Sequence, residues 1–104
     1  MKQLFWTAYS NAERHLVITS IKDIVNQFGD MVDYKFFSDI SINMTIEIEE
    51  YKIDAMFQAL SKIVTIDGFE PIDSHAKTER TIYMNVTFTK ATGNLKIEVP
   101  EVPG

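Results

Sequence analysis

Alternation of apolar and polar residues predicts the strands of this chain. The clearest run covers residues 40–49, where isoleucine or methionine fills every second position and serine, asparagine, threonine or glutamate fills the others. A strand with this pattern buries one side and keeps the other in water. Weaker alternation predicts further strands over residues 2–9, 31–37 and 79–89.

Helical spacing predicts two helices between these strands. Ser10 and Glu13 fit a capping box, so we expect the first helix to begin there and to run to about Phe28. Gly29 follows at the position where a left-handed residue closes a helix. The second helix is expected to follow Glu49 and to end near Val64, with a core face made of Ile53, Met56, Phe57, Leu60 and Ile63.

The order of these elements predicts an α+β fold, the ferredoxin-like two-layer sandwich (β-α-β-β-α-β). In this plan two helices lie on one face of an antiparallel sheet, and residues 2–9 and 40–49 form its central strands. Two segments compete for the fourth core strand. Residues 69–74 contain Pro71, which restricts them to an edge or a loop, and residues 79–89 form the longer alternating run.

The C-terminal part predicts an extra β-hairpin, with a loop at residues 90–94 and a return strand at 95–99. We therefore expect one domain over residues 1–99 and a frayed tail at 100–104. The run from Ser61 to Glu70 resembles the helix-to-strand corner of ferredoxin-like domains in type IV pilus assembly proteins. This resemblance is one of fold over about ten residues, and it assigns no family.

Composition narrows the function classes. Of the 104 residues, 10 are Lys or Arg and 15 are Asp or Glu, which gives a net charge of -5, and the cations are scattered. This distribution argues against nucleic acid and against an anionic membrane as partners. The chain has no cysteine, which excludes disulfides and thiolate chemistry. No apolar stretch approaches the ~20 residues of a membrane span, and the N-terminus turns polar too early for a signal peptide, so a cytoplasmic location is expected.

Catalytic and metal-binding patterns are weak. The glycines are isolated, so the Gly-rich loops that bind nucleotide phosphates are missing. The best local set of ligands is Asp73, His75 and Glu79, which we interpret as a polar loop, and His15 is interpreted as a surface or boundary residue. Two acidic groups are interpreted as solvated rims: Glu47, Glu49, Glu50 and Asp54, and Asp67, Glu70 and Asp73. We predict no catalytic residue, no cofactor and no metal site, which favours a protein that is not an enzyme.

The strongest functional signal is a set of aromatic residues at strand positions where the alternating pattern otherwise places polar residues. If Leu4, Trp6 and Ala8 face the helices, a set of aromatics on the other side has no helix to cover it: Phe5, Tyr9, Phe37 and Tyr83. Exposed aromatics on one sheet face are typical of an interface. Three occupants stay open: a second copy facing the first sheet to sheet, the chain's own hairpin at 79–99, or a ligand.

Two functions fit this pattern. The first is a small non-catalytic interaction module that dimerises or docks through its open sheet face. The alternative is a regulatory domain resembling ACT-type domains, which holds a small metabolite at a dimer interface. We expect a homodimer, with a protein or a small metabolite as the further partner.

Overall fold

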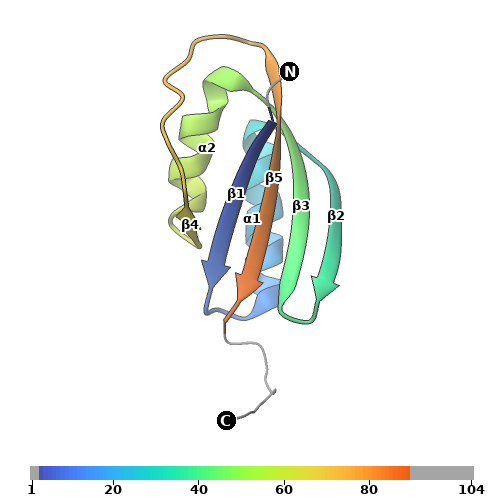
Figure 1. Ribbon diagram of the computed structural model, residues 1–104. Coiled ribbons are helices and arrows are strands. Elements are labelled where there is room, and N and C mark those ends of the chain that lie inside the picture. The colour runs from blue at the N-terminus through green and yellow to red at the C-terminus, as the bar shows by residue number, and fades with distance from the viewer. Residues whose placement is uncertain (1–2, 90–104) are drawn as a thin grey trace.

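The computed structural model describes residues 3–89 and shows a mixed α+β fold with a five-stranded sheet and two α-helices (Figure 1). The elements follow in the order β1 (Gln3–Ser10), α1 (Arg14–Phe28), β2 (Asp30–Ser38), β3 (Ser41–Glu49), the 3-10 turn η1 (Glu50–Lys52), α2 (Ile53–Leu60), β4 (Thr65–Asp67) and β5 (Glu79–Phe88). The strands that alternation predicted are therefore present. The predicted hairpin partner at 95–99 and the tail lie outside the described residues.

The strand order is β2-β3-β5-β1-β4, which differs from the predicted plan. β1 and β3 are interior strands, as predicted, but β5 lies between them, parallel to β1 and antiparallel to β3, so the predicted ferredoxin-like order of a wholly antiparallel sheet is not observed. The inward side chains of β5 explain this position: Ile82, Met84, Val86 and Phe88 are all buried. A strand flanked on both sides buries such a row more completely than an edge strand can.

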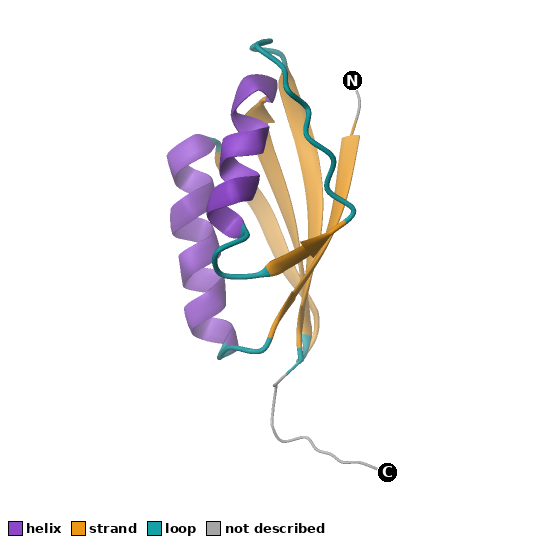
Figure 2. Cartoon of the chain, turned by 90° about the vertical axis from the view of Figure 1, so that its left-hand side faces the viewer, coloured by secondary structure: helices purple, strands orange, loops and turns teal. Residues whose placement is uncertain are grey.

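Both helices cover the same face of the sheet, and no helix of the described residues lies on the opposite face (Figure 2). The core lies between the two layers. It is made of the inward residues of β1, β3 and β5 together with the buried faces of α1 and α2, which contribute Val17, Ile18, Ile21, Val25, Ile53, Met56 and Leu60. The predicted inward phases of the three long strands are confirmed, because Trp6, Met44 and Met84 are each at most 4% exposed.

The first helix begins later than the predicted capping box implied. Ser10 is the last residue of β1, where it pairs with Phe88, and its hydroxyl oxygen accepts a bond from the Ala12 amide at 3.1 Å. Glu13 is itself the N-cap, and its carboxylate accepts bonds from the amides of His15 at 3.0 Å and Leu16 at 3.2 Å. The strand pairing holds the chain extended through Ser10, which moves the cap three residues on.

Gly29 closes α1, but in an extended conformation rather than the predicted left-handed one, with φ -157° and ψ -143°. The requirement for glycine comes from packing, because a Cβ at this position would collide with the Glu47 carbonyl oxygen and crowd Ile48 of β3. The close approach of the helix end to β3 therefore depends on this residue. The second helix is shorter than predicted, since α2 ends at Leu60 and a turn occupies residues 61–64.

Of the two segments that competed for the fourth core strand, residues 79–89 form β5, which lies in the sheet between β1 and β3. The edge strand beside β1 is β4, only three residues long, and it ends before Gly68, which has a φ of +78°. Residues 69–74 form no strand, in keeping with Pro71, and they run as a loop along the outer side of β1 (Figures 1 and 2). In the described part of the chain, no helix is long and apolar enough to cross a membrane.

Candidate docking surface on the open sheet face

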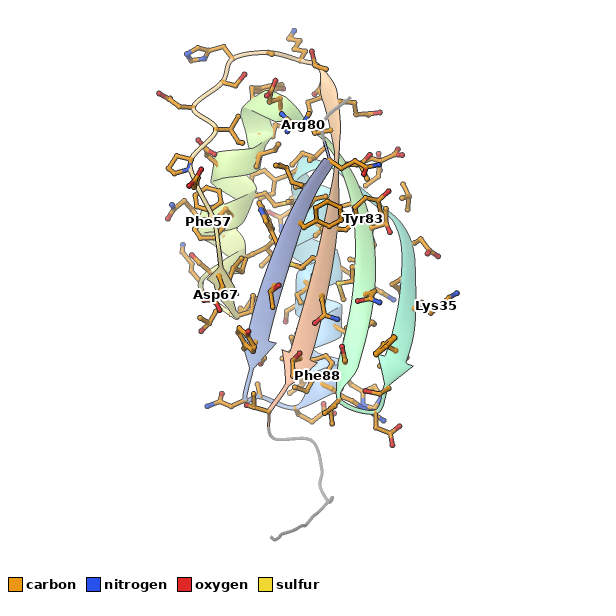
Figure 3. All side chains as sticks on the ribbon, viewed as in Figure 1. Lys35, Phe57, Asp67, Arg80, Tyr83 and Phe88 are labelled. Atoms are coloured by element: carbon orange, nitrogen blue, oxygen red, sulfur yellow. The ribbon has the colours of Figure 1, made fainter. Side chains whose placement is uncertain are left out.

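The helix-free side of the sheet carries the candidate interface. Because side chains alternate along each strand, the residues between the buried positions project here in rows across the sheet. One row contains Asp33, Thr45, Tyr83 and Phe5, and the next contains Lys35, Asn43, Asn85 and Thr7. Figure 3 looks onto this face, with Tyr83 in front of β5 and Lys35 beyond the outer side of β2. We call it the open face.

Phe5 and Tyr83 form an aromatic pair on the open face. They occupy adjacent positions of β1 and β5, and their rings stack with centroids 5.4 Å apart and an angle of 22° between the planes. The Gln3 side-chain amide donates a bond to the Tyr83 hydroxyl at 3.4 Å. Phe5 remains 72% exposed. The pair therefore presents a broad apolar surface that the chain's described residues leave in water.

The other two candidate aromatics lie away from this pair. Tyr9 is at the opposite end of β1, roughly 13 Å from Phe5 along the strand. Phe37 lies on β2, where the register with β3 shifts between Phe36 and Ser38, and β3 and β5 separate it from β1. Phe37 is 78% exposed and Tyr9 is 39% exposed. The structure thus brings together Phe5 and Tyr83 from the predicted set, and it places Tyr9 and Phe37 at separate corners of the sheet.

A shallow hollow of about 360 Å³ lies beside the aromatic pair, between β1, β5 and β3. Its outer lining consists of Phe5, Tyr83, Thr7, Thr45, Asn43 and Asn85. The Asn85 amide nitrogen donates to the Ser41 hydroxyl at 2.8 Å and to the Asn43 side-chain oxygen at 2.7 Å. These bonds hold the amides in a fixed orientation, so the hollow has one apolar wall and one polar wall with a defined geometry.

The charge around the hollow is mostly negative. Asp33 neighbours Thr45 on the outer strand, Glu47 projects from the next row of β3, and Asp67 lies opposite Thr7 on the other side. Lys35, in the next row of β2 after Asp33, adds a positive charge at the outer side of this strand. Carboxylates on both flanks of an apolar anchor attract a partner of opposite sign and repel a second acidic surface.

The acidic group at the start of α2 is structural rather than a shared site. The Asp54 carboxylate accepts bonds from the amides of Ile72 and Asp73, both at 2.8 Å, and so attaches the loop after β4 to the helix. Glu49 pairs with Lys52 at 3.5 Å. Asp54 and Glu49 thus each have a protein partner, whereas the sequence predicted a solvated rim.

Glu50 takes part in an ion pair that the sequence analysis missed. Arg80 Nη1 lies 2.6 Å from Glu50 Oε2, and Arg80 is only 8% exposed. Arg80 is at an inward-facing position of β5, two residues before the buried Ile82. Its ion pair with Glu50 connects the start of β5 to η1. The sequence did contain a signal for this pair: Arg80 stands at an inward-facing position of the strand, and a charge buried there needs a partner.

Asp73 and His75 of the loop and Glu79 at the start of β5 are not gathered into a ligand set. Within residues 3–89, no group of three or more histidines and carboxylates lies close enough to hold a metal ion. His15 is exposed on the first turn of α1, where its Nδ1 lies 2.9 Å from the Glu13 carboxylate. The amide of His15 is the main cause that lowers the pKa of Glu13 below its usual 4.5, because the bond favours the charged carboxylate.

Comparison with protein-family models, with curated proteins and with solved structures gives no match for this chain.

Proposed function

We propose that the protein is a non-catalytic interaction module that docks a basic protein partner on its open face. The stacked pair of Phe5 and Tyr83 carries the proposal. An aromatic residue that is 72% exposed forgoes most of the roughly 1.5–3 kcal/mol that burial would return. Large exposed aromatics beside a defined hollow are the usual anchors of protein interfaces.

The expected charge of the partner follows from the charged residues that surround the hollow. Asp33, Glu47 and Asp67 surround the anchor, and the whole chain has a net charge of -5. Two copies docked face to face would bring these carboxylates toward identical carboxylates. A partner that inserts an apolar side chain and carries Lys or Arg around it satisfies both features.

The test uses a phage-displayed library of random peptides, selected on the wild-type protein at low salt. We expect the enriched peptides to combine an apolar residue with flanking Lys or Arg. Their affinity should fall at least tenfold on the double variant Phe5→Ser/Tyr83→Ser, because the anchor surface is lost. It should also fall as salt is raised.

Tyr9→Ser provides the matched control, since Tyr9 lies on the same face but outside the hollow. Peptides enriched on the wild type should bind this variant unchanged. Enriched peptides that lack basic residues, or that bind the Phe5→Ser/Tyr83→Ser variant as tightly as the wild type, would contradict the proposal. Circular dichroism of both variants verifies that the fold is intact.

The hollow also supports the alternative of an ACT-like domain that binds a small metabolite. Its volume of about 360 Å³ lies within the range of small-molecule sites, and the side-chain amides of Asn43 and Asn85 could form hydrogen bonds with a polar ligand. A thermal-shift screen of amino acids and common metabolites distinguishes this alternative. It predicts a rise in melting temperature that Phe5→Ser/Tyr83→Ser abolishes, whereas the docking module predicts no shift.

A further inference from the structure

Within residues 3–89, strand β2 is an open edge of the sheet, and it has an apolar surface. It is the outermost strand beside β3, and along its nine residues every side chain except Met31 is exposed. The exposed side chains include Val32, Tyr34, Phe36 and Phe37. An edge strand of this length offers unpaired backbone amide and carbonyl groups, and proteins normally block such edges.

The irregularities of β2 limit which part of the edge can pair. Its register with β3 shifts between Met31 and Asp33 and again between Phe36 and Ser38. Between these two bulges, Asp33–Phe36 stays in regular register with β3. A partner strand must therefore be centred on this short run, because bulges disrupt a ladder.

The charges of this run are complementary to those of a second copy. In an antiparallel pair with a twofold axis at Tyr34, Asp33 of each copy faces Lys35 of the other. The same register sets Val32 against Phe36, so apolar residues also face each other. A register shifted so that Tyr34 faces Lys35 would instead set Asp33 against Phe36, and it forms no ion pair. Opposite charges at facing positions stabilise a strand pair, and like charges destabilise it.

We propose that two copies of this chain associate through β2 in antiparallel register about Tyr34, which joins their sheets into one continuous sheet of ten strands. Such a contact is isologous and closes on itself, because both β2 edges are used. The other edge ends in the three-residue β4 and the loop after it. The association therefore stops at the dimer and leaves both open faces accessible for the proposed docking function, on which it does not depend.

The test measures mass by sedimentation equilibrium at micromolar concentration. The wild type is expected at twice 11.9 kDa. Asp33→Lys sets lysine against lysine at two positions of the dimer, and Lys35→Asp sets acid against acid. Each variant alone is expected to raise the dimer dissociation constant about tenfold or more.

Two combinations make the test specific for the register. An equimolar mixture of the two single variants places opposite charges at both facing positions, so we expect it to form a heterodimer. The double variant Asp33→Lys/Lys35→Asp should recover the homodimer. Asp67→Lys, which makes the same charge change on β4, is the matched control and should leave the mass unchanged.

The proposal is overturned if the wild type sediments as a monomer, if the single variants stay dimeric, or if the mixture fails to recombine. A dimer that Phe5→Ser/Tyr83→Ser disrupts while Asp33→Lys does not would instead place the contact on the open face. Loss of peptide binding with an intact β2 dimer would contradict the docking function alone, so the two proposals fail separately.

Discussion

The two edges of the sheet are built differently. At the β4 edge, the loop after Gly68 covers the outer side of β1. Phe69 of this loop stacks on Phe57 of α2 with centroids 3.5 Å apart and meets the Trp6 ring edge-on at 5.9 Å. The Asp54 carboxylate then fixes the loop backbone to α2. The edge is closed by the chain's own side chains.

At the β2 edge, side chains of α1 contact the strand from the helix side. Lys22 of α1 lies over the Tyr34 ring at 3.9 Å, and Arg14 lies over the Phe36 ring at 5.7 Å. No described segment runs along the outer side of β2. The aromatic residues of the β4 edge therefore contribute to folding, whereas those of the β2 edge remain available for association.

The largest expected effect comes from the closed edge. Phe69→Ala should lower the free energy of unfolding by about 2–4 kcal/mol, because the ring packs against Phe57 and Trp6. Urea denaturation measures this loss. Phe37→Ala removes the same side chain from the open edge, where it is 78% exposed, and should change the stability of the monomer by less than about 0.5 kcal/mol. Equal losses in the two variants would remove the distinction between the edges.

A smaller effect is expected from the carboxylate that holds the loop. Asp54→Ala removes both bonds to the loop amides and should destabilise the protein by about 1–2 kcal/mol. Hydrogen exchange should become faster at the amides of Ile72 and Asp73, with little change in β2. Glu70→Ala, in the same loop but exposed, serves as the control. Unchanged exchange at Ile72 and Asp73 would show that other contacts hold the loop.

On the open edge, Val32→Ser should weaken association without weakening the fold. Val32 is 49% exposed, so its removal should change monomer stability by less than about 0.5 kcal/mol. In the proposed dimer it faces Phe36, and its loss should raise the dissociation constant several-fold. Sedimentation at two concentrations measures association, and denaturation of the dilute protein measures stability. A loss of stability at high dilution would mean that the open edge also supports the monomer.

The smallest effect concerns the first turn of α1. From this turn, the Arg14 side chain donates a bond to the Asp39 carbonyl oxygen and lies over the Phe36 ring. Folding lowers the pKa of Glu13 below 4.5, so its carboxylate stabilises the folded state above that pH. This contribution decreases as the pH falls through the lowered pKa. Glu13→Gln should therefore melt below the wild type at neutral pH, and the two melting curves should converge in acid. A constant difference at all pH values would contradict the capping role.

The sequence predicted the local features because strand and helix periods are local. The inward phase of Met44 and Met84 follows from alternation, and Phe5 was correctly assigned to the exposed phase. The insertion of β5 between β1 and β3 was not predictable in this way, since it depends on pairing between residues far apart in the chain. The Phe5–Tyr83 stack follows from that pairing. The true N-cap also escaped prediction, because the extension of β1 to Ser10 depends on its partner Phe88.

The burial of Arg80 could have been predicted from the sequence, because Arg80 continues the row of inward-facing positions of β5. The aromatic closure of the β4 edge was not, since Phe69 lies in an irregular loop whose path is set by Asp54 and α2. The bulges of β2, which break the simple alternation around Val32 and Phe37, were not predicted from the sequence.

Hydrogen exchange at two protein concentrations tests the contrast between the edges most directly. Backbone amides of a strand become protected when a partner strand pairs with them. We expect that raising the concentration slows exchange in the centre of β2, around Tyr34, and leaves exchange in β4 and the loop after it unchanged. Exchange in β2 that is independent of concentration, or new protection at the β4 edge instead, would contradict it.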